Sequence, residues 1–363
     1  MDEYEQKLGL IRSWMADRKL GALFLQRVSS FAWATCGAAS YINVASTDGV
    51  ASLLITPDHQ YLFTNNIEAP RLEKEEKLLD QGWDFRIAPW NGTNDTVAGL
   101  TRGLSLASDG FFPGALDVSS ELARLRACLS SEEVARFRVL GALCAQAMDA
   151  AIHAVKPSMT ENAITGMLAG EAEKRAVQAI VNLIATDERI YDYRHPLPTE
   201  KKFERYAMLV LCGRHRGLVC SLTRFVHFGR LPDELRRRAE AVARIDATYI
   251  ASTRPGQTLG AIFEQAVAAY AAAGFAEEWQ RHHQGGPAGY EPREYLATPG
   301  SKEIVASGQV YAWNPTITGS KSEDSVLINE NGFEILSAIP GWPMVKVEVG
   351  GRIIERPDIL IVK

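Results

Sequence analysis

The sequence feature that most constrains the fold is a pattern that occurs twice, about a hundred residues apart. In the first copy, a long helical segment over residues 130–155 ends at the pentapeptide KPSMT (residues 156–160), and an Ala- and Glu-rich helical segment follows. In the second copy, a charged helical segment over residues 233–252 ends at RPGQT (residues 254–258), and a second Ala-rich helix follows. The repeat predicts two αβ halves related by a pseudo-twofold axis. The alternative is that both pentapeptides are simply common breaks between helices.

Local signals support helices and strands in both halves. Ser130 followed by Glu133 is typical of a capping box, and Thr160 is a good N-cap for the helix after the first break. Strand-like runs then follow, at residues 180–184, 207–211, 218–222 and 225–228 in the first half and at residues 309–313, 325–329 and 346–349 in the second. Antiparallel strands packed under paired helices form an α+β domain, and the concave face of such a sheet is the natural place for a site.

The first third of the chain alternates helix and strand signals. A chain of 363 residues is too long for one ordinary core, so we expect about two domains. Residues 3–17 have helical periodicity, residues 22–26 form a short apolar run, and two β-like runs flank a Pro-Asp turn at residues 57–58. We therefore expect a small α/β domain over residues 1–121 and a larger domain over residues 122–363.

Composition excludes several classes of partner. The net charge is −5 and the positive residues are scattered, so we expect no nucleic-acid partner. No apolar run reaches the roughly 18 residues that a membrane span needs, and the acidic N-terminal segment differs from a signal peptide, so we expect no membrane partner. Five cysteines without CxxC spacing favour reduced thiols and a cytoplasmic protein.

Four short phrases carry a resemblance to a known family. They are CSLTR at residues 220–224, HHQGGPAG at residues 282–289, WNP at residues 313–315 and SEDSVLI at residues 322–328. In this order they resemble the pita-bread family of methionine aminopeptidase, prolidase, aminopeptidase P and creatinase, and the likeness covers nearly the whole chain. The resemblance implies an α+β pita-bread domain with a pseudo-twofold duplication, preceded by a smaller creatinase-type α/β domain. It also implies a homodimer.

The resemblance implies that most of the family's metal ligands are missing. In metal-dependent relatives these phrases supply two aspartates, one histidine and two glutamates around a pair of metal ions. Carried over to this sequence, only the histidine, His282, and the second glutamate, Glu323, remain. The other positions hold Val210 or Leu211, Ser221 and Asn314. Because a pair of divalent ions needs several charged or imidazole donors, we expect no metal and no other cofactor, with rescue by His195 or His215 as the alternative.

Three residues are candidates for catalysis. Creatinase keeps the fold without the metals, and its acid/base histidine lies in a loop that His195 matches here. An imidazole can take a proton from water and give it to a leaving nitrogen, so we expect His195 to act as general acid and base, assisted by His282 and Glu323. The alternatives are that His195 is an exposed loop histidine and that Glu323 braces the sheet.

Further residues of these phrases are candidates for substrate binding. The amide of Asn314 can donate and accept hydrogen bonds, and Lys321 stands where relatives place an arginine. Adjacent histidines on a strand point to opposite faces, so His283 is expected to line a neighbouring wall. The expected substrate-binding set is His283, Asn314, Arg224, Glu294, Lys321, Tyr290 and Trp313. For Arg224, a structural ion pair is the alternative.

These residues favour a metal-independent, creatinase-like hydrolase or lyase that cleaves a C–N bond in a small polar nitrogen compound. Activity on creatine itself is not expected, because Thr223 stands where creatinase holds a catalytic glutamate. Two alternatives stay open. One is a non-catalytic pita-bread module that binds a peptide or small ligand, and the other is an Xaa-Pro-type metallopeptidase with an unconventional metal site.

Overall fold

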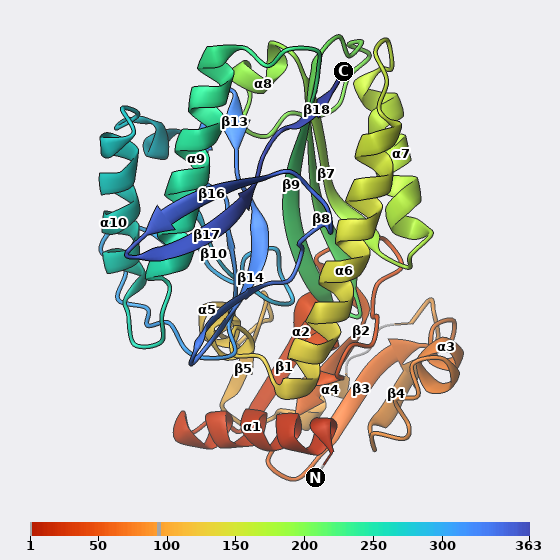
Figure 1. Ribbon diagram of the computed structural model, residues 1–363. Helices are drawn as coiled ribbons and strands as arrows, with labels where there is room; N and C mark the ends of the chain where they lie inside the picture. Colours follow the sequence, from red (N-terminus) through yellow and green to blue (C-terminus); the bar gives the residue numbers. More distant parts are fainter. Residues whose placement is uncertain (1, 93–95) are drawn as a thin grey trace. The chain divides into compact units, whose positions relative to one another are not determined.

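The computed structural model describes residues 2–92 and 96–363, and the chain divides into two compact units, Met1–Arg126 and Ala127–Lys363 (Figure 1). The boundary expected after residue 121 lies inside helix α5 (Ser119–Arg126), whereas the compact units separate after this helix. Within the described ranges, no helix is both long enough and apolar enough to cross a membrane.

The first unit is built on one six-stranded sheet with the strand order β4-β3-β2-β1-β5-β6. Strand β1 (Ala22–Arg27) pairs antiparallel with β2 (Asp48–Ile55) and parallel with β5 (Leu106–Ser108), so the sheet is mixed. The remaining elements are α1 (Glu3–Asp17), α2 (Val28–Ala34), β3 (Gln60–Asn65), α3 (Ala69–Lys74), β4 (Asp84–Ala88), α4 (Thr96–Leu100) and β6 (Leu116–Asp117). This is the small α/β arrangement that the first third of the sequence predicts.

The second unit has two halves with the same order of elements, two helices followed by strands. The first half contains α6 (Ser131–Ala154), α7 (Glu161–Glu173), β7 (Gln178–Thr186), α8 (Arg189–Asp192), β8 (Tyr206–His215) and β9 (Leu218–Phe228). The second half contains α9 (Asp233–Ser252), α10 (Leu259–Ala272), η1 (Glu278–Arg281), β10 (Gly285–Ala288), β11 (Val310–Trp313), β12 (Thr316–Ile317), β13 (Ser320–Lys321), β14 (Asp324–Asn329) and β15 (Gly332–Ile335). The chain ends with β16 (Met344–Val349), β17 (Arg352–Pro357) and β18 (Leu360–Val362).

The two pentapeptide breaks adopt the same conformation, which supports the duplication. Thr160 and Thr258 both cap the helix that follows, and their hydroxyls accept hydrogen bonds from backbone N–H groups at 3.1 and 3.2 Å. Each threonine also forms an isolated antiparallel bridge, to Lys202 and to Ile304. The third residue of each break has a positive φ, 74° at Ser158 and 88° at Gly256. The two breaks are therefore equivalent turns.

The halves meet where β9 runs beside β14. The backbone N–H of Ser221 donates to Ser325 Oγ at 2.9 Å, and that of Thr223 donates to the Glu323 carbonyl at 3.2 Å. The sheets have the strand orders β18-β9-β8-β7 and β10-β11-β14-β15. Helix α6 packs on β8 and β9, and α9 packs on the β16–β17 hairpin. The second unit therefore brings the site phrases of both halves together at the β9–β14 junction.

Candidate functional site

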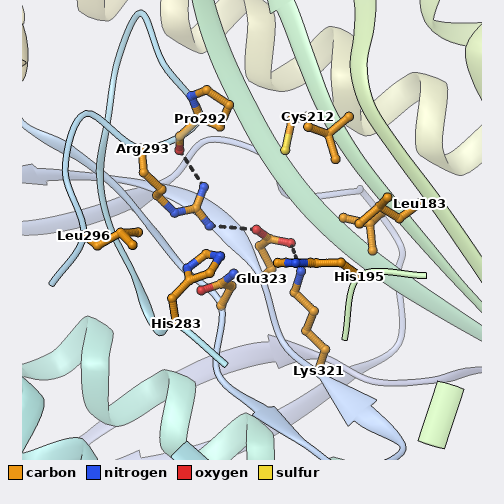
Figure 2. Close-up of a pocket in the computed structure, with 12 residues that line it drawn as sticks. Leu183, His195, Cys212, His283, Pro292, Arg293, Leu296, Lys321 and Glu323 are labelled. Atoms are coloured by element: carbon orange, nitrogen blue, oxygen red, sulfur yellow. Dashed lines mark hydrogen bonds and ion pairs between the residues drawn. The ribbon is translucent and has the colours of Figure 1, made fainter. Parts of the chain in front are cut away.

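A cavity of about 470 Å³ lies in the second unit, between strands of the first half and loops of the second (Figure 2). Its lining residues are Val181, Leu183, His195, Val210, Cys212, His283, Pro292, Arg293, Leu296, Asn314, Lys321 and Glu323. Strands β7 and β8 supply an apolar wall, and the segments around β13 and β14 supply charged groups. The volume is within the range of about 300–1,000 Å³ that small-molecule sites occupy.

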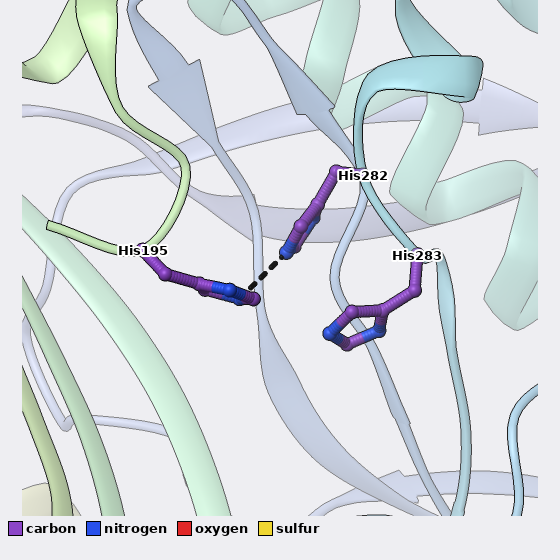
Figure 3. A group of neighbouring side chains, drawn as sticks. All are labelled: His195, His282 and His283. Carbon is purple, nitrogen blue, oxygen red and sulfur yellow. Dashed lines mark hydrogen bonds between the residues drawn. The ribbon is translucent and has the colours of Figure 1, made fainter.

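Three histidines cluster at this cavity (Figure 3). His282 Nε2 lies 3.0 Å from His195 Nε2, and one ring nitrogen from each of His195, His282 and His283 can be chosen so that all lie within 4.8 Å of one another. The sequence suggested that only one of the adjacent histidines could face the site. Both rings reach His195, because residues 282 and 283 precede strand β10 and are not part of its alternating pattern.

The histidine cluster is neutral near pH 7. Burial, then the Lys321 ammonium and the neighbouring histidines, together lower the pKa of His282 to about 2. Burial, followed by the Arg293 guanidinium, lowers the pKa of His283 to about 4. Burial and Lys321 also lower the pKa of His195. Imidazoles with such low pKa values are poor proton carriers at neutral pH, but neutral imidazole is the form that binds metal ions.

Glu323 is held by two cations instead of facing the cavity as a free carboxylate (Figure 2). Its carboxylate accepts hydrogen bonds from Lys321 Nζ at 2.7 Å, Arg293 Nη2 at 2.8 Å and Thr223 Oγ1 at 2.6 Å. Burial alone would raise the pKa of Glu323, but the Lys321 ammonium and the Arg293 guanidinium outweigh it and hold this pKa well below its usual range. Glu323 is therefore a fixed anion, and three of the roughly four acceptor positions of its carboxylate are occupied.

The residues at the family's metal positions do not fit a pair of divalent ions. Val210 lines the cavity and is the aliphatic residue that replaces the first aspartate, whereas Leu211 is not among the lining residues. Ser221 Oγ accepts from Arg293 Nη1 at 3.2 Å, so a guanidinium bridges Ser221 and Glu323. Asn314 is buried and supplies an amide in place of a carboxylate. A cation already lies among these positions, and bridging carboxylates are missing.

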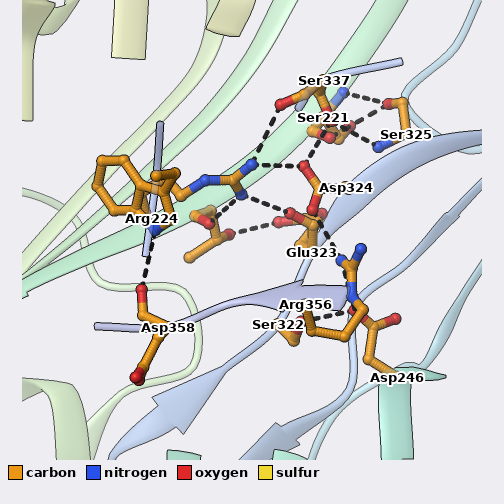
Figure 4. Close-up of polar contacts among 12 residues, drawn as sticks. Ser221, Arg224, Asp246, Ser322, Glu323, Asp324, Ser325, Ser337, Arg356 and Asp358 are labelled. Atoms are coloured by element: carbon orange, nitrogen blue, oxygen red, sulfur yellow. Dashed lines mark hydrogen bonds and ion pairs between the residues drawn. The ribbon is translucent and has the colours of Figure 1, made fainter. Parts of the chain in front are cut away.

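Arg224 belongs to a buried ion network outside the cavity (Figure 4). Its Nη2 donates to Asp324 Oδ1 at 2.7 Å, and Arg356 donates to both Asp324 and Asp246 at 2.7 Å. Burial raises the pKa of Asp246 even beside the Arg356 guanidinium. Arg224 is thus an ion-pair partner that joins β9 to β14, which was the alternative to substrate binding.

Three other expected substrate-binding residues also lie outside the cavity lining. Trp313 stacks on Tyr249 with 4.4 Å between the ring centroids, so it is part of the core. The Tyr290 hydroxyl donates to Glu133 at 2.6 Å, and Glu294 accepts from the Tyr290 backbone N–H at 2.8 Å. These contacts brace the loop after β10.

Sequence reasoning omitted Arg293, Cys212 and the apolar wall from the site. Arg293 follows the HHQGGPAG phrase in the loop after β10, and only the fold shows that its guanidinium lines the cavity and reaches Glu323. Val181, Leu183 and Leu296 carry no sequence signal of a binding role, because apolar residues on strands and loops usually belong to a core.

The family model described as metallopeptidase family M24 matches residues 135–345, which is more than half of the chain. The chain belongs to this family. Its fold is similar to that of the prolidase from Pyrococcus horikoshii OT3, with a TM-score of 0.78, 18% identity, and coverage of 92% of this chain and 98% of that one. These matches confirm the predicted pita-bread fold.

Curated relatives also match at the sequence level, among them a peptidase and a cyclase. An uncharacterized peptidase from Staphylococcus epidermidis is 24% identical over 235 residues, or 61% of this chain, and the matched region spans 65% of that relative's length. An agropine synthesis cyclase from Rhizobium rhizogenes is 30% identical over 140 residues, covering 36% of this chain and 35% of the relative.

The prediction of a metal-independent, creatinase-like hydrolase is contradicted by these comparisons. The matching family is one of metallopeptidases, and the matching proteins include a prolidase and a peptidase. The sequence prediction took the missing ligands at three of the five family positions as evidence against a conventional metallopeptidase, and it kept a metallopeptidase with an unconventional metal site as an alternative. The comparisons favour the metallopeptidase alternative instead.

Proposed function

We propose that the protein is a metallopeptidase that cleaves short peptides of the Xaa-Pro kind and uses a metal site different from the family's ion pair. The observation that carries this proposal is the cavity, which has one apolar wall and one positively charged side. Membership of family M24 supports peptide-bond hydrolysis. The similarity to a prolidase and to a peptidase supports the same class of substrate.

A short peptide combines apolar side chains with a charged carboxylate end, and the cavity offers partners for both. Val181, Leu183 and Leu296 would contact the side chains of the peptide. On the charged side, Lys321 and Arg293 are two cations against the one carboxylate of Glu323, which leaves a charge of +1. The free carboxylate of a dipeptide would balance this charge.

Asn314 is placed to hold the polar backbone of the peptide. Its Oδ1 is buried and has no hydrogen-bond partner among the described residues. A buried acceptor without a partner costs about 1–3 kcal/mol, so an N–H group of the substrate would stabilise it. Binding of an amine or amide N–H at Asn314 would place the peptide between the apolar wall and the two cations.

The test is incubation of the full chain with leucyl-proline, leucyl-alanine and leucyl-proline amide, with zinc, cobalt or manganese added in separate reactions. The products are identified by mass spectrometry. We expect the proline dipeptide to be split into free leucine and proline, with the mass of one water added.

Two other outcomes would contradict the proposal. Loss of one water from a substrate without cleavage would indicate cyclisation, the kind of reaction for which the Rhizobium cyclase is named. Stabilisation of the protein by a dipeptide with no turnover under any of the three metals would favour the non-catalytic binding module.

A further inference from the structure

We propose that His195, His282 and His283 bind one divalent transition-metal ion, with zinc as the best fit, at a place that shares only His282 with the family's five ligand positions. This inference deepens the proposed function, since it names the ion that a peptidase without the family's carboxylates would use. The metal-binding test below is independent of peptidase activity.

The geometry of the cluster suits three ligands of a tetrahedral ion. Zinc binds imidazole nitrogens at about 2.0–2.1 Å, which places the ligand nitrogens about 3.3 Å apart. His195 Nε2 and His282 Nε2 are already 3.0 Å apart, and all three chosen nitrogens lie within 4.8 Å of one another. A movement of about an ångström at the tip of one side chain would bring the three nitrogens to the spacing that zinc requires. The loop that carries His195 is exposed, so that movement meets little resistance.

Unpartnered ring nitrogens are a second observation that points to a ligand. The Nδ1 atoms of His282 and His283 are both buried, and neither has a hydrogen-bond partner among the described residues. Buried polar side-chain atoms usually form hydrogen bonds, so two such ring nitrogens in one cluster of three histidines indicate a site for a ligand. An ion held by His195 Nε2 and His282 Nε2 that also bound His283 Nδ1 would satisfy one of these two nitrogens.

The surroundings leave a fourth coordination position open to the cavity. His195 and His283 line the cavity, so a water molecule or a substrate atom could reach an ion held between them. Three protein ligands with one open position is the pattern of catalytic zinc sites. An ion there would supply a Lewis acid for the peptide carbonyl.

The nearby charges limit the affinity but do not exclude the ion. Lys321 and Arg293 repel a cation, while Glu323, which is within 2.8 Å of a nitrogen of each, cancels one of the two charges.

The experiment measures zinc binding to the chelator-stripped full chain by calorimetry, and bound zinc after dialysis by elemental mass spectrometry. We expect about one ion per chain in the wild-type protein. The variants His195→Ala and His283→Ala should each lose at least about tenfold in affinity, because even loss of an outer-shell partner costs 10–100-fold. His153→Ala, which removes an exposed histidine of α6, is the matched control and should bind zinc as the wild type does. Cobalt in place of zinc should give the visible absorption of a tetrahedral site.

Three outcomes would overturn the inference. These are less than about 0.1 ion per chain at saturating zinc, unchanged affinity in both cluster variants, or two ions per chain that persist in both variants. The last result would locate the ions at the family positions. Circular dichroism of each variant separates loss of ligand from loss of fold, and His195→Ala changes only an exposed loop side chain. Hydrolysis without bound metal would overturn this inference but leave the proposed peptide substrate unchanged. Bound metal without hydrolysis would support this inference and contradict the proposed peptidase activity.

Discussion

At the scale of single residues, the decisive feature is how charge is distributed around Glu323. One carboxylate faces an ammonium and a guanidinium at 2.7 and 2.8 Å, so the cavity side is positive although the whole chain has a net charge of −5. Breaking a buried pair leaves an uncompensated charge, which makes substitution of Glu323 itself a poor test of catalysis. Residues that line the cavity without being part of this pair are better probes.

Leu296→Glu should weaken binding of substrates that end in a carboxylate. Leu296 lines the cavity and is 46% exposed, so the side chain of a glutamate at this position can stay in contact with solvent. Its carboxylate would cancel the excess positive charge of the cavity. We expect the Kd of leucyl-proline, measured by calorimetry, to rise about tenfold, which is about 1.4 kcal/mol. The Kd of leucyl-proline amide, which lacks the carboxylate, should change little.

The matched control for this change is Ile353→Glu, which adds the same charge on β17 at a residue outside the cavity lining. If Leu296→Glu raised the Kd of leucyl-proline and of leucyl-proline amide equally, the effect would be steric and the cavity would not bind the carboxylate.

Cys212 should be unreactive at neutral pH even though it lines the cavity. Burial raises the pKa of Cys212 to about 11, and the Glu323 carboxylate adds to the rise. The thiolate is the reactive form, so alkylation by iodoacetamide at pH 8 should be about a hundredfold slower than for a free thiol. The rate should increase as the pH approaches 11.

Peptide mapping by mass spectrometry measures this labelling, with a small free thiol such as glutathione as the reference. Labelling of Cys212 at pH 8 as fast as that of glutathione would mean that the raised pKa is wrong.

At the scale of elements, the repeated breaks show which local signals are reliable. The capping box at Ser130 forms as the sequence predicts: the Glu133 backbone N–H donates to Ser130 Oγ at 3.1 Å, and the Ser130 backbone N–H donates to the Glu133 carboxylate at 2.7 Å. Thr160 caps its helix as predicted, and Thr258 does the same in the second break. These features were predictable because each depends only on residues three positions apart. Trp313 was misplaced because alternation along β11 puts Trp313 in the core and its neighbour Asn314 at the cavity.

The two breaks should respond differently to substitutions at their third residue. Gly256 has a φ of 88° and open space where a Cβ would be added, so Gly256→Ala tests the backbone alone. An L-residue in this region costs about 1–2 kcal/mol, and we expect the free energy of unfolding in urea to fall by that amount.

Ser158 has the equivalent positive φ, and Ser158→Gly removes its strain while it adds freedom to the unfolded chain. We expect this change to alter the free energy of unfolding by less than about 0.5 kcal/mol. Equal destabilisation by both substitutions would mean that the breaks are not equivalent turns.

At the scale of the whole second unit, one buried ion network connects the two halves (Figure 4). Arg224 comes from β9 of the first half, while Asp324, Asp246 and Arg356 come from β14, α9 and β17. All four side chains are almost completely buried. Four charges that satisfy one another at 2.7 Å tolerate little displacement, so the halves are expected to unfold together.

Arg356→Met should destabilise the second unit by about 3–5 kcal/mol, because it leaves buried carboxylates without their partner. Urea unfolding followed by tryptophan fluorescence measures the change. Lys346→Met removes an exposed cation whose partner Glu355 is 3.9 Å away on the same hairpin, so it should cost less than about 1 kcal/mol. Similar losses in the two variants would mean that the network contributes no more than a surface pair.

The sequence by itself determined the fold class, the duplication and the loss of the family's metal ligands, because capping pairs, turn residues and short phrases are local and can be read in order. Only the tertiary structure decided what the remaining residues do. His195 and His282 are 87 positions apart, and Glu323 is 100 positions from Thr223. Whether such residues meet depends on how the two halves pack, and whether a carboxylate is free depends on which cations reach it. The three-histidine cluster and the ion pairs that hold Glu323 both result from that packing.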